Sequence, residues 1–300
     1  MEKAVVTGGL GFIGYHLCQA LLEAGLEVVC IEQPNETSIQ GMDEKLLAMG
    51  RNALFEHISG DLDKEDSTIA DRLSRADVVF HMASPSSKDS KWPMKHQTIL
   101  QATKWVQFLC GSMKDDARIL FPSTVEVYGD VPGLITEDTP LQPVSSYGMI
   151  KAEIELCVQK EAQLNNLNYT ILRLPTVYGP WQRPDMTFAQ ILSEEAEVYQ
   201  DRSTLDALFV DDVVNGFVLA AKSTNQSDIF HLTSGEQGQW FVAAQKLGAK
   251  ADILKRTHSR SSLSPKKAEQ QLGFNVTVTI EEGLRRQKEH MDKWNNTWDI

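Results

Sequence analysis

A strand, a glycine-rich loop and a helix follow one another within the first 25 residues. Residues 3–7 are a short apolar run, and apolar side chains recur at helical spacing over residues 12–24. The loop between them has the pattern GxxGxxG, whose glycines permit a tight turn and close approach of the backbone to a pyrophosphate. We therefore expect a dinucleotide to bind at Gly8, Gly11, Phe12, Ile13 and Gly14.

The alternation of strand-like and helical segments continues as far as residue 174. We expect further strands at 27–32, 53–58, 76–82, 118–122 and 169–174, and long helices at 92–113 and 146–165. Strands that alternate with helices favour right-handed crossovers and a parallel sheet with helices on both faces. The predicted fold class is α/β, a doubly wound parallel sheet of the Rossmann type.

Beyond about residue 175, glycine and proline interrupt this pattern, and short strand-like pieces mix with helices. One such piece is residues 229–232. We interpret residues 1–175 as an NAD-binding Rossmann domain and residues 176–300 as a smaller C-terminal α/β cap that binds substrate, with an interleaved boundary.

Composition narrows the classes of partner. The net charge of -12 disfavours binding to nucleic acid or to an anionic membrane surface, and no apolar run approaches the length of about 20 residues that a membrane helix needs. The four cysteines, at positions 18, 30, 110 and 157, form no CxxC pair, so we expect no metal site. The N-terminus has no signal-peptide pattern, which favours a cytoplasmic protein.

Acidic residues follow the second and third predicted strands. Glu32 closes the second strand, 18 residues after Gly14, where a carboxylate can accept hydrogen bonds from the ribose hydroxyls of NAD and would repel the extra phosphate of NADP. The alternative for Glu32 is a solvated charge at a strand end. Asp61 and Leu62 follow the third strand, and Asp61 is a weaker candidate for the adenine amino group.

A candidate catalytic set lies in the second quarter of the chain. Tyr147 and Lys151 form the pattern YxxxK, which places both side chains on one face of a helix. A nearby ammonium group favours the phenolate form of tyrosine and so lowers its pKa toward neutral pH. Thr124 lies just after the fifth predicted strand, 23 residues before Tyr147, and can bind the same substrate oxygen.

These motifs occur in a recognisable order. The glycine loop is followed by HMAS at 81–84, SxxxVYG at 123–129, YxxxK, and LR…VYGP at 172–180. In this order the chain resembles the NAD-dependent epimerase/dehydratase family of extended short-chain dehydrogenases, over nearly its whole length and most strongly over 1–186. The segment 179–186 is similar to the branch of UDP-glucose and UDP-glucuronate 4-epimerases.

The resemblance implies a bound NAD cofactor that contacts Ala83, and a nucleotide-sugar substrate that contacts Ser84 and Arg183. Tyr147 would take the proton from the sugar O4, Thr124 would hold O4, and Lys151 would position the nicotinamide ribose. Relatives often form homodimers through two long helices. Here these would be 92–113 and 146–165, with Val106 and Leu109 expected to point outward.

Three positions depart from the family pattern. Val125-Glu126 replaces the Asp-Glu pair of the 4,6-dehydratases, which disfavours dehydration, although Glu126 is compatible with a decarboxylase or could only orient the substrate or Tyr128. Leu205 replaces an arginine that clasps the diphosphate, so Arg202 or Arg260 could take over that role, unless both are ordinary surface residues. Ile99 replaces a common asparagine, with no clear consequence.

The favoured function is that of an NAD-dependent nucleotide-sugar 4-epimerase that acts through a transient 4-keto intermediate on a UDP-hexose or UDP-hexuronate. The alternatives are a UDP-sugar decarboxylase or 4-ketoreductase on the same scaffold and, in another class, a non-catalytic NAD-binding regulator.

Overall fold

Seven parallel strands form the central sheet of the computed structural model, which describes residues 1–34, 41–83, 96–194, 205–225, 227–254 and 261–298. The strand order is β10-β7-β5-β4-β1-β2-β3. The strands are β1 (Lys3–Thr7), β2 (Glu27–Glu32), β3 (Phe55–Ser59), β4 (Val78–His81), β5 (Arg118–Thr124), β7 (Asn168–Leu174) and β10 (Asp228–His231). This sheet confirms the predicted doubly wound class.

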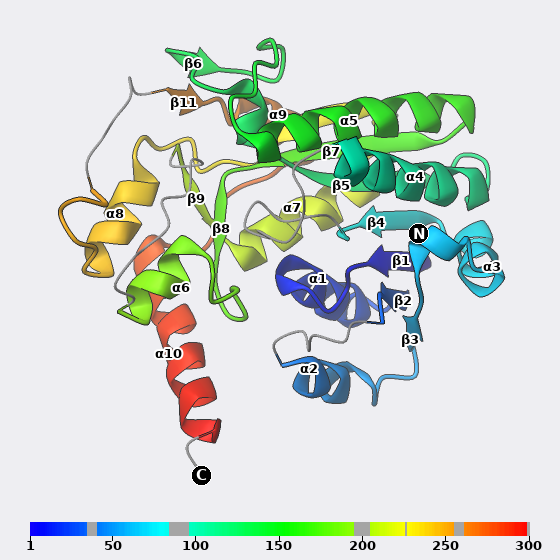
Figure 1. Cartoon of the computed structure of the whole chain (residues 1–300), viewed down its shortest axis with the longest axis horizontal. Coiled ribbons are helices and arrows are strands. Elements are labelled where there is room, and N and C mark those ends of the chain that lie inside the picture. The colour runs from blue at the N-terminus through cyan, green and yellow to red at the C-terminus, as the bar shows by residue number, and fades with distance from the viewer. Residues whose placement is uncertain (35–40, 84–95, 195–204, 226, 255–260, 299–300) are drawn as a thin grey trace.

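Helices cover both faces of the sheet (Figure 1). On one face lie α1 (Phe12–Glu23) and α7 (Val210–Lys222), with α2 (Met42–Met49) beside α1; on the other lie α3 (Ser67–Arg75), α4 (His96–Ser112) and α5 (Ser146–Leu164). Successive strand residues alternate between the two cores: Val5 packs with the α3–α5 layer, whereas Val6 packs with α1 and α7. The central strands β1, β2 and β4 are buried on both faces, which explains their nearly continuous apolar runs.

The later elements form smaller sheets and helices beside the carboxyl edge. Strand β8 (Thr176–Tyr178) pairs in parallel with β9 (Ala207–Phe209), and β6 (Leu134–Ile135) pairs in parallel with β11 (Ser262–Leu263). The remaining elements are η1 (Leu62–Lys64), η2 (Val125–Tyr128), α6 (Thr187–Leu192), α8 (Gln239–Lys246), α9 (Lys266–Leu272) and α10 (Ile280–Trp298).

One strand from the later half of the chain completes the main sheet. β10 pairs with β7 in parallel register, from Asp228 opposite Thr170 to His231 opposite Arg173. The sequence placed this strand in the cap, but the strand belongs to the main sheet. We retain the division near residue 175 as a proposal, in which the second part contributes β10 to the sheet of the first.

Candidate active site

The glycine-rich loop lies between the carboxyl ends of β1 and β4, where the strand order of the sheet reverses. Gly8 has a φ of +68°, and a Cβ there would lie 2.6 Å from the backbone nitrogen of Ala83. A Cβ on Gly14 would lie 2.2 Å from the carbonyl oxygen of Gly8. Helix α1 then begins at Phe12 with Gly11 as its N-cap, which has no side chain to shield the first turn. This bare backbone fits a pyrophosphate.

Glu32 ends β2 and contacts the same loop. Its Oε2 accepts a hydrogen bond from the backbone N–H of Leu10 at 3.1 Å. Burial raises the pKa of Glu32, while the N–H of Leu10 and the charge of Lys45 act in the opposite direction. A carboxylate held beside bare glycine backbone fits a ribose with free hydroxyl groups, and so the residues present fit NAD.

Asp61 and Leu62 have structural partners in the described chain. Asp61 caps η1, because its Oδ1 accepts from the backbone N–H of Asp63 at 3.0 Å, and it also accepts from the side-chain amide of Gln33 at 3.3 Å. The side chain of Leu62 is buried in the core beneath α3 and α4. Contact of either residue with the adenine remains a prediction.

Lys45 also contacts the glycine loop, although no motif in the sequence indicates this contact. It lies on α2 with its side chain buried, and its Nζ donates to the carbonyl oxygen of Leu10 at 2.9 Å. Leu10 is thus held through its N–H by Glu32 and through its carbonyl by Lys45. Burial lowers the pKa of Lys45 to about 8, and the charge of Glu32 opposes that change.

The structure brings Thr124, Tyr147 and Lys151 to one end of the sheet. Thr124 is the last residue of β5, and Tyr147 and Lys151 lie in the first two turns of α5, which packs against β5. The Nζ of Lys151 lies 5.7 Å from the centre of the Tyr147 ring. A Cβ on Gly148 would lie 2.6 Å from the carbonyl oxygen of Glu126, so only glycine lets α5 approach the segment after Thr124 this closely.

Lys151 is buried, and its Nζ donates to the carbonyl oxygen of Pro122 at 2.8 Å. Burial lowers its pKa to about 7, and the charge of Glu155 one turn further along α5 opposes this. Both protonation states of the lysine are therefore populated near neutral pH. That property suits a residue that responds to the charge of the neighbouring phenol.

Glu126 is held by the helix that carries Tyr147. Its Oε2 accepts from the hydroxyl of Ser145 at 2.5 Å, and the same hydroxyl accepts from the N–H of Gly148 to cap α5. The N–H of Glu126 donates to the Oγ1 of Thr124 at 3.2 Å. Glu126 is therefore a fixed carboxylate beside the catalytic set.

A buried polar network lies under this site. The guanidinium of Arg173 makes two hydrogen bonds to the carboxylate of Glu155, at 3.1 and 2.8 Å, and a third to the Tyr128 hydroxyl at 2.5 Å. The same hydroxyl lies 2.5 Å from Nε2 of His231 on β10. The network joins the segment after Thr124 to α5, β7 and β10, and so it fixes the backbone that positions the catalytic set.

The predicted substrate residues are only partly described. Arg183 is half-exposed, and its guanidinium is paired with the carboxylate of Asp185 through contacts of 2.9 and 2.8 Å. Leu205, at the position of the expected arginine, packs against an apolar cluster. Ser84, Arg202 and Arg260 lie outside the described residues.

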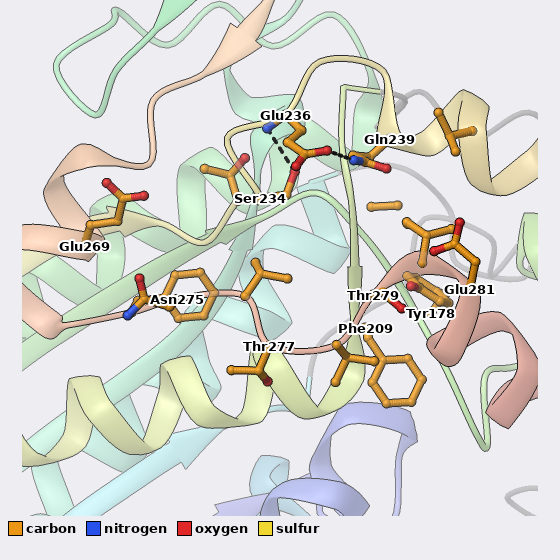
Figure 2. Close-up of a pocket in the computed structure, with 17 residues that line it drawn as sticks. Tyr178, Phe209, Ser234, Glu236, Gln239, Glu269, Asn275, Thr277, Thr279 and Glu281 are labelled. Atoms are coloured by element: carbon orange, nitrogen blue, oxygen red, sulfur yellow. Dashed lines mark hydrogen bonds between the residues drawn. The ribbon is translucent and has the colours of Figure 1, made fainter.

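A cavity of about 620 Å³ lies among the later elements (Figure 2). Glu269, Glu236 and Glu281 lie around it, and none of the described residues that line it is a lysine, arginine or histidine. None of these described lining residues belongs to the candidate catalytic set or to the glycine loop. The three carboxylates disfavour the diphosphate of a nucleotide sugar.

Metal-binding clusters and membrane-spanning helices are both absent from the described residues. Within the described ranges, histidines, cysteines and carboxylates form no group of three or more that could hold a metal ion. None of the described helices combines the length and apolar character needed to cross a bilayer.

Comparisons with known proteins agree with this geometry. The model of the family described as "NAD dependent epimerase/dehydratase family" matches residues 4–232. The chain is 31% identical over 227 residues to the uncharacterized UDP-glucose epimerase YtcB of Bacillus subtilis, and the alignment covers 71% of each chain. Its structure superposes on a UDP-glucuronic acid 4-epimerase from Bacillus cereus, in complex with UDP-glucuronic acid and NAD, with a TM-score of 0.82, 27% identity and coverage of 97% and 99%.

The fold is shared more widely. DesIV, a dTDP-glucose 4,6-dehydratase from Streptomyces venezuelae, superposes with a TM-score of 0.81 at 23% identity over 99% of both chains. At this identity the likeness concerns the fold alone. With the family model spanning three quarters of its length, the chain is a member of the NAD-dependent epimerase/dehydratase family, an enzyme whose cofactor is NAD.

Proposed function

We propose that the chain is a nucleotide-sugar 4-epimerase that acts on a UDP-hexose or UDP-hexuronate through a transient 4-keto sugar. The observation that carries the proposal is that Thr124, Tyr147 and Lys151 meet at the same edge of the sheet as the glycine loop, with β4 between β5 and β1. The similarity to a UDP-glucuronic acid 4-epimerase, at 27% identity, supports the choice of reaction.

Each catalytic side chain has a role that its position supports. Tyr147 removes the proton from the sugar O4, while the hydroxyl of Thr124 holds that oxygen. Lys151, buried below the Tyr147 ring, stabilises the phenolate and the nicotinamide ribose. NAD, when bound, supplies the acceptor and donor of the hydride at C4. Rotation of the 4-keto sugar before its reduction then inverts C4.

Val125 is the reason to prefer epimerisation to dehydration. It follows Thr124 directly, is buried, and has no proton to donate to a leaving hydroxyl group. Glu126, held by Ser145 beside Thr124, keeps a decarboxylase as the second candidate. A 4-ketoreductase uses the same tyrosine and lysine and remains a further alternative. Membership in an enzyme family disfavours the non-catalytic regulator.

The recognition of the diphosphate differs from the family pattern. The side chain of Leu205 cannot bind phosphate oxygens, so we propose that Arg202 or Arg260 replaces the missing arginine. We also propose that the guanidinium of Arg183 releases the carboxylate of Asp185 when it binds the sugar. We also retain the cytoplasm as the site of action.

We further propose a homodimer through α4 and α5, which lie side by side on one face of the sheet (Figure 1). Val106 and Leu109 were expected to point outward, and this was wrong: both are buried in the core between these helices and the sheet. Exposed apolar side chains among the described residues of the pair include Leu100, at 52%, and Leu156, at 56%, and Met149 and Leu164 on α5 are exposed as well. These give the face that a second copy would cover.

The test is a turnover screen read by proton NMR. The protein with NAD is incubated with UDP-glucose, UDP-N-acetylglucosamine or UDP-glucuronate. A C4 epimer without net NADH supports the epimerase and identifies the sugar. Release of carbon dioxide with a pentose product would instead establish the decarboxylase and make Glu126 its centre.

The Tyr147→Phe variant tests the mechanism. Loss of the general base is expected to lower kcat at least about a hundredfold. Tyr169→Phe, a change of the same kind on β7, is the matched control and should keep the parent rate. Turnover of Tyr147→Phe within about threefold of the parent would contradict the assigned role.

A further inference from the structure

Trp181 has an unusual backbone for a bulky residue. Its φ is +65°, in the left-handed region that side chains with a Cβ rarely adopt. It follows β8 and precedes Arg183 by two positions. A conformation of this kind persists only where the surroundings impose it, and such positions occur preferentially at functional sites.

On one side, Trp181 packs against the elements that hold the cofactor loop. The Nζ of Lys45 lies 4.8 Å from the centre of its ring, and the Tyr15 ring of α1 lies edge-on at 6.0 Å. Gly41, just before α2, has a φ of +63°, and a Cβ there would come within 2.0 Å of the indole ring. Since Lys45 also donates to the carbonyl oxygen of Leu10, one side chain joins the indole to the glycine loop.

On the other side, helix α10 holds the same segment, which lies between α1 and α10 (Figure 1). The N–H of Trp181 donates to Nδ1 of His290 at 3.5 Å, and the rings of His290 and Trp294 lie 4.4 and 4.8 Å from the indole. The side-chain amide of Gln287 donates to Gln182 at 2.5 Å. These contacts fix both the backbone and the ring.

The neighbouring residues are fixed as well. The carbonyl of Pro180 lies 2.9 Å from Nε2 of His16 on α1, and Gln182 donates to the carbonyl oxygen of Val177 at 2.9 Å. Residues 180–182 are therefore held from α1, β8 and α10. Because Arg183 is the next residue, the position of its backbone is set by this segment.

We propose that Trp181 is a positioning residue that couples the NAD-binding loop, through Lys45, to the substrate-binding segment at Arg183. When NAD restrains Leu10, Lys45 and the indole are restrained with it, and Arg183 is presented to the nucleotide sugar. The inference rests on the proposed substrate role of Arg183. By reciprocity, the substrate segment must also influence the affinity for NAD.

The experiment measures binding by calorimetry, with NAD-free protein titrated with NAD, and NAD-saturated protein titrated with UDP. The variants are Lys45→Met, Trp181→Phe and the double variant. Lys45→Met should weaken NAD binding about tenfold, because it removes the donor to Leu10. Trp181→Phe should weaken NAD binding roughly threefold and UDP binding about fivefold.

The double variant tests whether Trp181 affects NAD binding through Lys45. Its NAD affinity should match that of Lys45→Met alone, because the indole acts on the loop through the lysine. Additive losses, or a Trp181→Phe variant whose NAD affinity stays within about twofold of the parent, would overturn the coupling.

One further variant is a control, and another replaces Trp181→Phe if that variant does not fold. Lys267→Met removes a lysine that likewise lies over a ring, Phe230 at 5.0 Å, and donates to a backbone carbonyl, that of Ile229 at 2.9 Å, but outside the path; its affinities should equal those of the parent. If Trp181→Phe fails to fold, Gly41→Ala displaces the ring from the α2 side and should weaken both NAD and UDP binding.

Failure of the proposed function gives a different pattern. If the parent turns over no UDP-sugar and binds no UDP, while Trp181→Phe still weakens NAD binding non-additively with Lys45→Met, the coupling stands and the substrate class is wrong. If the parent epimerises a UDP-sugar but Trp181→Phe leaves the NAD affinity unchanged, the coupling is wrong and the function stands.

Discussion

Replacing Lys151 by methionine should stabilise the ligand-free protein at neutral pH while it weakens NAD binding. The lysine is buried, and burial lowers its pKa in the folded chain to about 7 from the ordinary value of 10.5. Because the folded pKa is the lower one, the unfolded chain binds more protons between about pH 7 and pH 10.5. The contribution of Lys151 to the stability of the parent therefore rises with pH across that window and levels off below it.

The magnitude follows from the same shift. At pH 7, burial of this lysine costs on the order of 4 kcal/mol, because each pKa unit corresponds to about 1.4 kcal/mol. Methionine keeps the length of the side chain and removes this cost. It also leaves the carbonyl oxygen of Pro122 without its donor, which costs about 1–3 kcal/mol. The net gain is about 2 kcal/mol at pH 7, and it vanishes or reverses near pH 10.

The assay is thermal unfolding followed by circular dichroism at pH 7 and pH 10, with NAD affinity measured in parallel. At pH 7, Lys151→Met should melt a few degrees above the parent. Lys222→Met, which changes an exposed lysine at the end of α7, is the control and should melt with the parent at both pH values. A Lys151→Met variant that melts below the parent by the same margin at both pH values would refute the reasoning.

Three other changes test separate parts of the structure. Gly8→Ala forces a Cβ to within 2.6 Å of the Ala83 nitrogen at a φ of +68°; thermal unfolding should show a loss of at least about 2 kcal/mol, and an unchanged melting temperature would contradict this. Glu32→Gln should weaken NAD binding about tenfold in calorimetry and reduce the ratio of the affinity for NAD to that for NADP. An unchanged ratio would show that Glu32 does not discriminate between the two cofactors. Leu156→Glu should convert the proposed dimer to a monomer in light scattering, and a parent that is already monomeric at micromolar concentration would rule the dimer out.

The parts of the site that sequence could predict are local. The glycines at 8, 11 and 14 and the pair Tyr147 and Lys151 are set by spacing within one loop or one helix, and the structure places them as that spacing implies. Their roles with NAD and substrate remain predictions. Six strands of the central sheet were also accessible, because they alternate with helical segments along the chain.

The parts that sequence missed depend on contacts between distant segments. Lys45 reaches Leu10 only because α2 packs beside α1, and no pattern within residues 33–52 indicates which backbone group its amine meets. Val106 and Leu109 are apolar, which shows that they pack, but the direction depends on where α3 and α5 lie around α4. β10 has only four residues, too few to indicate which sheet it joins.

The late arrival of β10 has a consequence for synthesis of the chain. Until residue 231 has left the ribosome, the outer edge of β7 has no partner strand, and the Tyr128 hydroxyl lacks its contact with His231. A nascent Rossmann half would then expose the open edge of a parallel sheet, which invites pairing with other chains. A chain cut at residue 175 should accordingly aggregate, and the two parts should mature together rather than one after the other.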